Sequence, residues 1–429
     1  MSTTSPATTP ADVTTDTPAR GVDASWAISL FGTAVGAGIL FLPMNAGGKG
    51  LWPLLVATIL IGPMTYFAHR AMARMVCVSP RKGEDITLVA RDYFGDVAGW
   101  AVTFLYFMAI FPIVLIYGVS ITNTVDSLIV HQFNGPHVNR VLLSGVLIGV
   151  MTLVLVFGEK LMLAVTQALV YPLIVLLAGI SIYLIPRWDF SAFSGSPSAG
   201  VWAIAGAICL TVPVLVFAFN HSPAISQFSL AMQRAHGDNA AKRASVVLAA
   251  TAIMLTVFTM FFVWSCSLAL GTEGLQDARA ENVPVLSHLA NVFDSPVLSY
   301  FAPAIAIAAI VSSYFGHVLG ASEGAASIAR GALHAAGVRS VNERKLQLWV
   351  YLFMFVCAWI AGILNPGILD MIETLSGPVI AALLYLMPMV AIYKVPALRP
   401  YRKQWSNLFV IIAGSIAILS IIYKVATGA

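Results

Sequence analysis

Charged residues are scarce in this chain. Asp, Glu, Lys and Arg make up 10% of its 429 residues, while 59% are hydrophobic. Soluble domains carry about 25% charged residues, so this composition excludes an ordinary soluble domain. It predicts a polytopic membrane protein whose partners include the lipid bilayer, and we expect no nucleic acid partner.

Motifs for metal, redox or phosphate chemistry are also missing. The four cysteines form no Cys-x-x-Cys pair, and neither a His-Glu-x-x-His motif nor a Walker loop occurs. We therefore expect no enzyme activity and no cofactor. A membrane-embedded enzyme and a channel stay as alternatives from other classes, although the chain shows no filter loop or repeated ring of charges.

Residues 1–23 differ from the rest because they are rich in Ser, Thr, Pro and Ala. They lack the basic and apolar regions of a secretory signal, and we expect a disordered cytoplasmic tail. Beyond them lie long apolar runs, and a membrane helix needs about 20 such residues. The runs predict eleven spans, at about 26–48, 51–77, 97–125, 138–157, 160–185, 200–231, 243–271, 297–330, 346–364, 368–393 and 404–426. The segment 79–95 between two of them predicts a short helix, either on the membrane surface or packed on the bundle.

The Lys and Arg residues predict the orientation, because cytoplasmic loops carry an excess of them. With the N-terminus inside, 18 of the 23 lie on the inner side. The outer side then holds only Lys49, Arg140, Arg187, Arg279 and Lys424. This bias predicts a cytoplasmic N-terminus and a periplasmic or extracellular C-terminus in a bacterial inner membrane.

Two spans carry signs of an interrupted helix. The first contains Gly32-Thr-Ala-Val-Gly-Ala-Gly38, and three glycines in seven residues weaken a helix that lipid cannot help to satisfy. The sixth contains Asn220, His221 and Ser222 directly before Pro223, and a proline removes a backbone donor. Local satisfaction of a kinked backbone is the alternative reading of these polar residues.

The spacing of the interruptions favours a transporter. They lie five spans apart, as in two inverted repeats of five helices, an architecture that binds its substrate near the bilayer midplane. Half-helix N-termini attract a carboxylate, and unwound carbonyls accept from an ammonium group or coordinate a cation. The pattern therefore predicts a site for a zwitterionic amino acid.

Several motifs resemble the hydroxy and aromatic amino acid permeases. They are Gly32 to Gly38 followed by Leu40-Phe-Leu-Pro43, Ile121-Thr-Asn-Thr124, Phe219-Asn-His-Ser-Pro223, Phe315-Gly-His-Val-Leu-Gly320 and Asn365-Pro-Gly-Ile-Leu-Asp370. Within that family, the segment Asn220 to Pro223 is more similar to the serine transporters of bacteria. The resemblance implies import of a small hydroxy amino acid, L-serine first, by symport and alternating access.

The resemblance also implies the leucine-transporter fold of the amino acid–polyamine–organocation superfamily. Its ten-helix core would cover residues 24–394, with repeats at about 24–187 and 200–394, and 404–426 would be an eleventh helix. The implied substrate-binding residues are Thr33, Ala34, Gly36, Ala37, Gly38, Tyr106, Tyr117, Phe217, Phe219, Asn220, His221 and Ser222. Asn220 and His221 would bond the substrate hydroxyl, which needs a partner in a dry site.

The coupling ion stays open between a proton and sodium. By the resemblance to sodium-coupled transporters of this fold, Gly32, Val35, Ala309, Ser312 and Ser313 would supply oxygen ligands for sodium. Proton-driven serine transporters tend to carry a lysine near Ser312, and this chain departs from that pattern. We nevertheless expect a proton first.

A proton-coupled carrier needs a group that titrates. The candidates are His221, which as a histidine titrates near pH 6.5 when unperturbed, and the intramembrane residues His317 and Glu323. Glu323 could equally pair with Arg330 or cap the inner end of its helix. We attribute Asp370 and Glu373 to the favourable dipole at a helix start.

Overall fold

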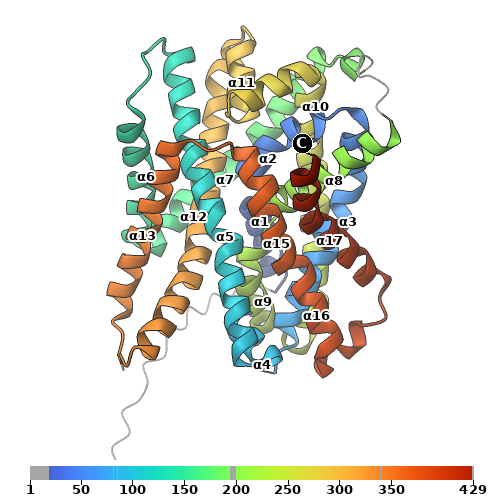
Figure 1. Ribbon diagram of the computed structural model, residues 1–429, viewed down its shortest axis with the longest axis vertical. Coiled ribbons are helices and arrows are strands. Elements are labelled where there is room, and N and C mark those ends of the chain that lie inside the picture. The colour runs from blue at the N-terminus through green and yellow to red at the C-terminus, as the bar shows by residue number, and fades with distance from the viewer. Residues whose placement is uncertain (1–18, 81, 85, 194–199, 339, 428–429) are drawn as a thin grey trace, which may run out of the picture.

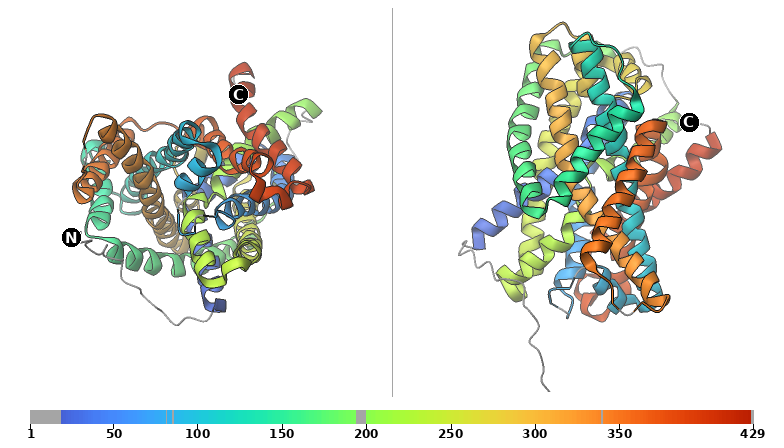
Figure 2. Two further views of the ribbon diagram at one scale, coloured as in Figure 1. Left: turned by 90° about the horizontal axis from the view of Figure 1, so that it is seen from below. Right: turned by 90° about the vertical axis from the view of Figure 1, so that its left-hand side faces the viewer.

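The computed structural model describes residues 19–80, 82–84, 86–193, 200–338 and 340–427, and the regular elements in these ranges are helices (Figure 1). Most of the long helices run roughly along one direction, and the first and last helices are inclined to it (Figure 2). Helix α4 lies at one end of this bundle and α11 at the other (Figure 1). We call these the α4 end and the α11 end.

In chain order the α-helices are α1 (Ala19–Ala34), α2 (Ala37–Leu42), α3 (Leu51–Cys77), α4 (Ile86–Phe94), α5 (Asp96–Ser127), α6 (Arg140–Val156), α7 (Glu159–Tyr183), α8 (Val201–Ala218), α9 (Ser222–His236), α10 (Ala240–Ala280), α11 (Val285–Val292), α12 (Pro296–Ala335), α13 (Glu343–Leu364), α14 (Ile368–Met371), α15 (Gly377–Ala381), α16 (Met387–Lys394) and α17 (Trp405–Thr427). Short π-helices extend α2 (η1, Pro43–Gly47) and α5 (η2, Leu128–Gln132), and two more join α14, α15 and α16 (η6, Ile372–Ser376; η7, Ala382–Leu386). Short 3₁₀ turns are η3 (Ile185–Arg187), η4 (Phe190–Phe193), η5 (Gly237–Asn239) and η8 (Pro396–Tyr401).

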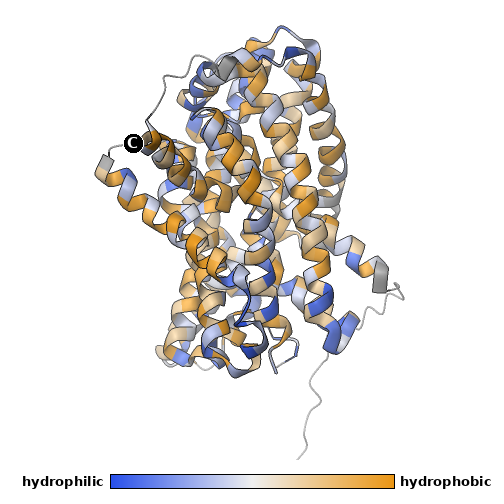
Figure 3. Ribbon diagram, turned by 90° about the vertical axis from the view of Figure 1, so that its right-hand side faces the viewer, coloured by the Kyte–Doolittle hydropathy of each residue, from blue (hydrophilic) through white to orange (hydrophobic). Residues whose placement is uncertain are grey.

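Most of the predicted spans are helices of the length and composition that crossing a bilayer requires. Within the described residues, nine helical stretches are long and apolar enough to cross a bilayer, and the bent pair at the start of the chain makes a tenth. Helix α6 is apolar but has 17 residues. Helices thus occupy each of the eleven predicted spans, and apolar residues cover most of their length (Figure 3).

The start of the chain departs from the prediction. Helix α1 begins at Ala19, so the last residues of the predicted tail are helical; residues 1–18 lie outside the described ranges. An ion pair anchors this part of α1, because Asp23 Oδ1 lies 2.8 Å from His236 Nε2 and Oδ2 accepts from Arg243. One turn further, Trp26 packs edge-on against Phe228 of α9.

The connection at the α11 end is more helical than the sequence suggests, whereas the one at the α4 end contains the predicted helix. The predicted loop after residue 271 continues as the last part of α10, beyond a kink at Gly271 with φ +68°, and then forms α11. The predicted helix in segment 79–95 is α4. It packs on the bundle, since Ile86, Val89 and Ala90 are buried and Tyr93 donates to the Met75 carbonyl.

Candidate functional site

The first predicted interruption is present. Helix α1 ends at Ala34, α2 begins at Ala37, and the two halves bend by 50°. Gly36 lies between them in an extended conformation, and its carbonyl accepts from Ile39 N–H at 3.2 Å. The glycine-rich stretch therefore breaks the helix in the middle of the bundle, as predicted.

Two glycines of this break are required by close packing. A Cβ on Gly36 would lie 2.6 Å from Ser313 Cβ and 2.7 Å from Tyr117 Oη. A Cβ on Gly38 would lie 2.6 Å from Ala218 Cα, a backbone atom at the end of α8. The start of α2 thus rests directly on the second interrupted helix.

The second interruption is also where the sequence places it. Helix α8 ends at Ala218 and α9 begins at Ser222, so Phe219, Asn220 and His221 are unwound. Pro223 stands in the first turn of α9, where its missing N–H has no helical acceptor to reach. The proline therefore begins a half-helix instead of kinking a continuous one.

The residues at the second break and the first residue of α9 are buried and keep several polar atoms unpaired. Asn220, His221 and Ser222 are each at most 2% exposed. Among the described residues, no hydrogen-bond partner reaches Asn220 Nδ2, His221 Nε2 or Ser222 Oγ. Because buried polar groups are normally bonded, three such atoms in consecutive residues mark a place where a polar ligand is expected.

A second histidine, His69 of α3, completes this region, and the sequence analysis missed it. Its ring stacks on that of His221 with centroids 3.5 Å apart and planes 6° from parallel. His221 N–H donates to His69 Nε2 at 3.1 Å. The signal available in the sequence was a histidine within a predicted membrane span, and ionisable residues there are functional candidates by default.

Helices α5 and α12 meet the first break at Ser313. Tyr117 Oη donates to Ser313 Oγ at 2.8 Å, and Ser313 Oγ donates to the Thr33 carbonyl at 3.2 Å. Ser312 Oγ donates instead to Ala309 O, 3.3 Å away in its own helix. The structure therefore brings Tyr117, Ser313 and the α1 backbone together, although the carbonyl bonded is that of Thr33, next to the predicted Gly32.

Some of the other predicted residues lie at the two breaks, and the rest lie further along α12 and α5. Ala34, Val35, Phe217 and Phe219 are buried at the breaks, and Phe217 lies against Gly38; Ala37 starts α2. His317 lies one turn beyond Ser313, where its Nδ1 bonds the Ser313 carbonyl at 2.8 Å and its ring meets Tyr117 edge-on. Tyr106 lies about 16 Å from Tyr117 along α5, at 1.5 Å per residue, and so is not part of the same cluster.

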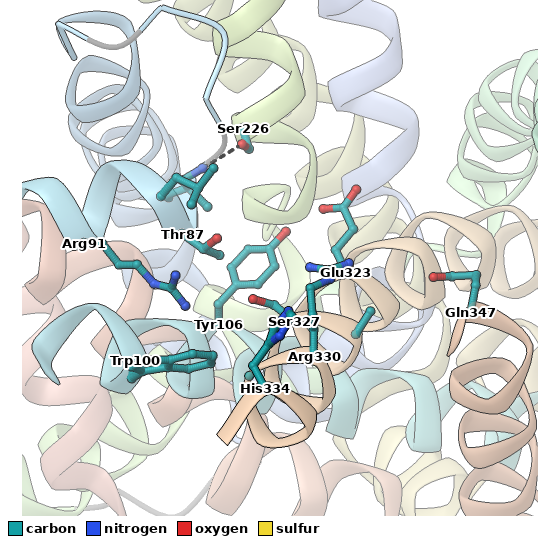
Figure 4. A pocket seen from close by; sticks show the side chains of 14 residues that line it. Thr87, Arg91, Trp100, Tyr106, Ser226, Glu323, Ser327, Arg330, His334 and Gln347 are labelled. Atoms are coloured by element: carbon teal, nitrogen blue, oxygen red, sulfur yellow. Dashed lines mark hydrogen bonds between the residues drawn. The ribbon is translucent and has the colours of Figure 1, made fainter. Parts of the chain in front are cut away.

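Tyr106 and Glu323 line a cavity of about 420 Å³ that extends toward the α4 end. Figure 4 shows Tyr106 at its centre, with Arg91 and Trp100 on one side and Glu323 on the other. Arg330 also lines it and makes a two-point ion pair with Glu343 at 2.7 and 3.1 Å. Tyr106 sits beside Gly320 and Pro223, so the cavity begins just beyond the second break.

A polar cluster lies toward the α11 end, and we call it the Glu373 cluster (Asn45, Lys49, Arg279, Asp370, Glu373 and Lys424). Glu373 is 4% exposed and accepts from Asn45 Nδ2 at 2.6 Å and Lys424 Nζ at 2.7 Å. Asp370 accepts from Lys424 at 3.0 Å and Arg279 at 3.2 Å. The two acids thus do more than favour a helix dipole, because they join η1 and the turn after it to α10, α14–η6 and α17.

Comparison with known proteins agrees with this arrangement. The family model described as the tryptophan/tyrosine permease family matches residues 24–427. The chain belongs to the tryptophan/tyrosine permease family. It is 46% identical over 413 residues to the serine transporter SdaC of Escherichia coli K12, covering 94% of this chain and 95% of that protein. It is 37% identical over 428 residues to the threonine/serine transporter TdcC of Escherichia fergusonii, covering 95% and 96%.

Solved structures show the fold of the permease. A mutant of the manganese transporter of Eremococcus coleocola superposes with a TM-score of 0.63 at 14% identity, over 98% of this chain and 89% of that one. MhsT in complex with L-phenylalanine gives 0.58 at 13% identity, over 94% and 98%. The leucine-transporter fold and the family resemblance are therefore confirmed, and the protein is a multi-pass membrane transporter, not an enzyme.

The Tyr117–Ser313 bond gives a first prediction for this permease. Tyr117→Phe removes the hydroxyl that donates to Ser313 beside the first break. Losing one buried hydrogen bond of about 1 kcal/mol should slow amino acid uptake roughly fivefold, measured in proteoliposomes. Tyr300→Phe, at an exposed position of α12, is the matched control, and equal rates for both variants would contradict a role for the bond.

Proposed function

We propose that this permease imports a small hydroxy amino acid, L-serine first, by symport with a proton through alternating access. The observation that carries the proposal is the meeting of the two interrupted helices, with Gly38 packed on Ala218 near the unpaired atoms Asn220 Nδ2 and His221 Nε2. Transporters of this architecture bind substrate at such paired breaks. Relatives described as serine and threonine/serine transporters support the choice of substrate.

The two ends of the bundle fit a carrier that exposes its site to one side at a time. The Glu373 cluster joins four segments at the α11 end, whereas a cavity extends from Tyr106 toward the α4 end. The Lys and Arg distribution supports placing the α4 end on the cytoplasmic side of a bacterial inner membrane. In this orientation the cavity lies on the path of release into the cell.

Sodium coupling is the second candidate, and one observation favours it. Ser313 Oγ lies 3.2 Å from the Thr33 carbonyl and 2.8 Å from Tyr117 Oη, which gathers three oxygen atoms at the first break. Sodium, like other hard cations, takes oxygen ligands. Gly32, Val35, Ala309 and Ser312 remain the other proposed ligands.

Uptake of labelled L-serine into proteoliposomes tests both forms of the proposal. In a sodium-free buffer with the outside acidic, we expect L-serine to accumulate inside the proteoliposomes above its external concentration. A protonophore should abolish this accumulation. Accumulation that requires a sodium gradient would indicate that the coupling ion is sodium and not a proton. Equilibration without accumulation would indicate a channel. Uptake that unlabelled tryptophan inhibits but unlabelled serine does not would overturn the proposal that serine is the substrate.

A further inference from the structure

His69 and His221 form a pair whose hydrogen bonds fix both tautomers. His69 Nε2 accepts from the His221 backbone N–H at 3.1 Å, so it carries a lone pair. The neutral ring then has its proton on Nδ1, which donates to the Thr65 carbonyl at 2.8 Å. Both nitrogens of His69 are therefore used, and the ring is held in one orientation against His221.

The His221 ring has the same tautomer for a separate reason. Its Nδ1 lies 3.1 Å from the Phe219 carbonyl, which can only accept, so Nδ1 carries the proton. In the described part of the chain no carboxylate bonds either ring, and a buried charge without a partner is strongly disfavoured. His221 is thus neutral, and its unpaired Nε2 is a hydrogen-bond acceptor.

The side-chain amide of Asn220 is also fixed in orientation, but its unpaired atom is a donor instead of an acceptor. Asn220 Oδ1 accepts from Ser222 N–H at 3.0 Å, which assigns the other amide atom as nitrogen. That Nδ2 is buried and unpaired, and it can only donate. Consecutive residues of the second break therefore offer one acceptor and one donor.

We propose that His221 Nε2 and Asn220 Nδ2 together bind the substrate hydroxyl, and that His69, which stacks on the His221 ring and accepts from the His221 backbone N–H, is the residue that positions this acceptor. A hydroxyl both donates and accepts, whereas an ammonium group only donates and a carboxylate only accepts. Of the groups on a hydroxy amino acid, the hydroxyl alone satisfies both atoms. This inference rests on the proposed function and names the chemistry by which its site selects the substrate.

Displacement of labelled L-serine from the purified permease by unlabelled ligands tests the acceptor without any mutation. We expect L-serine to compete at least about tenfold better than L-alanine, which lacks the hydroxyl, and than O-methyl-L-serine, which cannot donate. Equal competition by O-methyl-L-serine and L-serine would overturn the role of His221 Nε2. A permease that binds no amino acid would instead overturn the proposed function.

Variants of His69 then separate positioning from a structural role. His69→Phe keeps a ring to stack but removes the acceptor, and it should lower the preference for serine over alanine to within about twofold while alanine still binds. His69→Gln restores an acceptor and should recover part of the preference. His137→Phe, at an exposed histidine, is the control and should change nothing.

Two outcomes of the variant series would count against His69. Equal weakening of serine and alanine by His69→Phe would show that the residue only maintains the fold. If that variant does not fold, Asn220→Asp decides the proposal, because it exchanges the donating amide for an acceptor in the same space. It should abolish the preference for serine, and an unchanged preference would overturn the paired site.

Discussion

Gly38→Ala should reduce amino acid uptake by at least about tenfold. The added methyl group would stand 2.6 Å from Ala218 Cα and 2.8 Å from the Phe217 ring. Backbone cannot move aside as the end of a flexible side chain can, and overpacking of this kind costs about 1–3 kcal/mol. The substitution therefore separates the two breaks whose contact carries the proposed function. Initial rates in proteoliposomes, corrected for the amount of folded protein, measure the effect.

Gly316→Ala is the matched control for Gly38→Ala. Gly316 lies inside α12 with nothing within 4 Å of an added Cβ, and alanine is favoured over glycine in a helix by roughly 0.5–1 kcal/mol. This variant should keep its uptake and its stability. If Gly38→Ala also kept full uptake, the two breaks would not need their close contact for transport.

Glu373→Gln should lower the stability of the protein by about 3–5 kcal/mol, the usual effect of removing one partner from a buried ion pair. Glu373 is buried beside Lys424, Lys49 and Arg279. The neutral amide would leave these three cations with the single negative charge of Asp370. Thermal denaturation of the purified permease should show a clear drop in the midpoint.

A surface ion pair provides the comparison for Glu373→Gln. Glu343 is 64% exposed and pairs with Arg330 at the α4 end, and such pairs contribute at most about 1 kcal/mol. Glu343→Gln should therefore leave the midpoint nearly unchanged. Similar midpoints for the two variants would mean that the Glu373 cluster does not hold the α11 end together.

The two breaks could be predicted because their causes are local in the chain. Gly32 to Gly38 and Pro223 weaken a helix whatever surrounds them. The same holds for the apolar runs that set the spans. The start of α1 at Ala19 could not be predicted in this way, since it depends on the pairing of Asp23 with α9 and α10.

The parts of the site that the sequence did not predict depend on contacts between distant segments. His69 lies in a largely apolar helix, next to Arg70, and nothing near it in the chain indicates that it faces His221, 152 residues away. Glu373 and Lys424 are 51 residues apart, and their pairing follows from the packing of α17. Ser313 was predicted, yet its bond to the Thr33 carbonyl depends on how α12 lies against α1.

The anchor of Asp23 has a mechanical consequence for the transport cycle. Asp23 and Trp26 tie α1 to His236 and Phe228 of α9 and to Arg243 of α10. The half-helices that lead from both breaks toward the α4 end are therefore fastened to one another. If the permease works by the proposed alternating access, we expect a ligand that displaces one of these half-helices to move the other with it, so that the two move together as one unit.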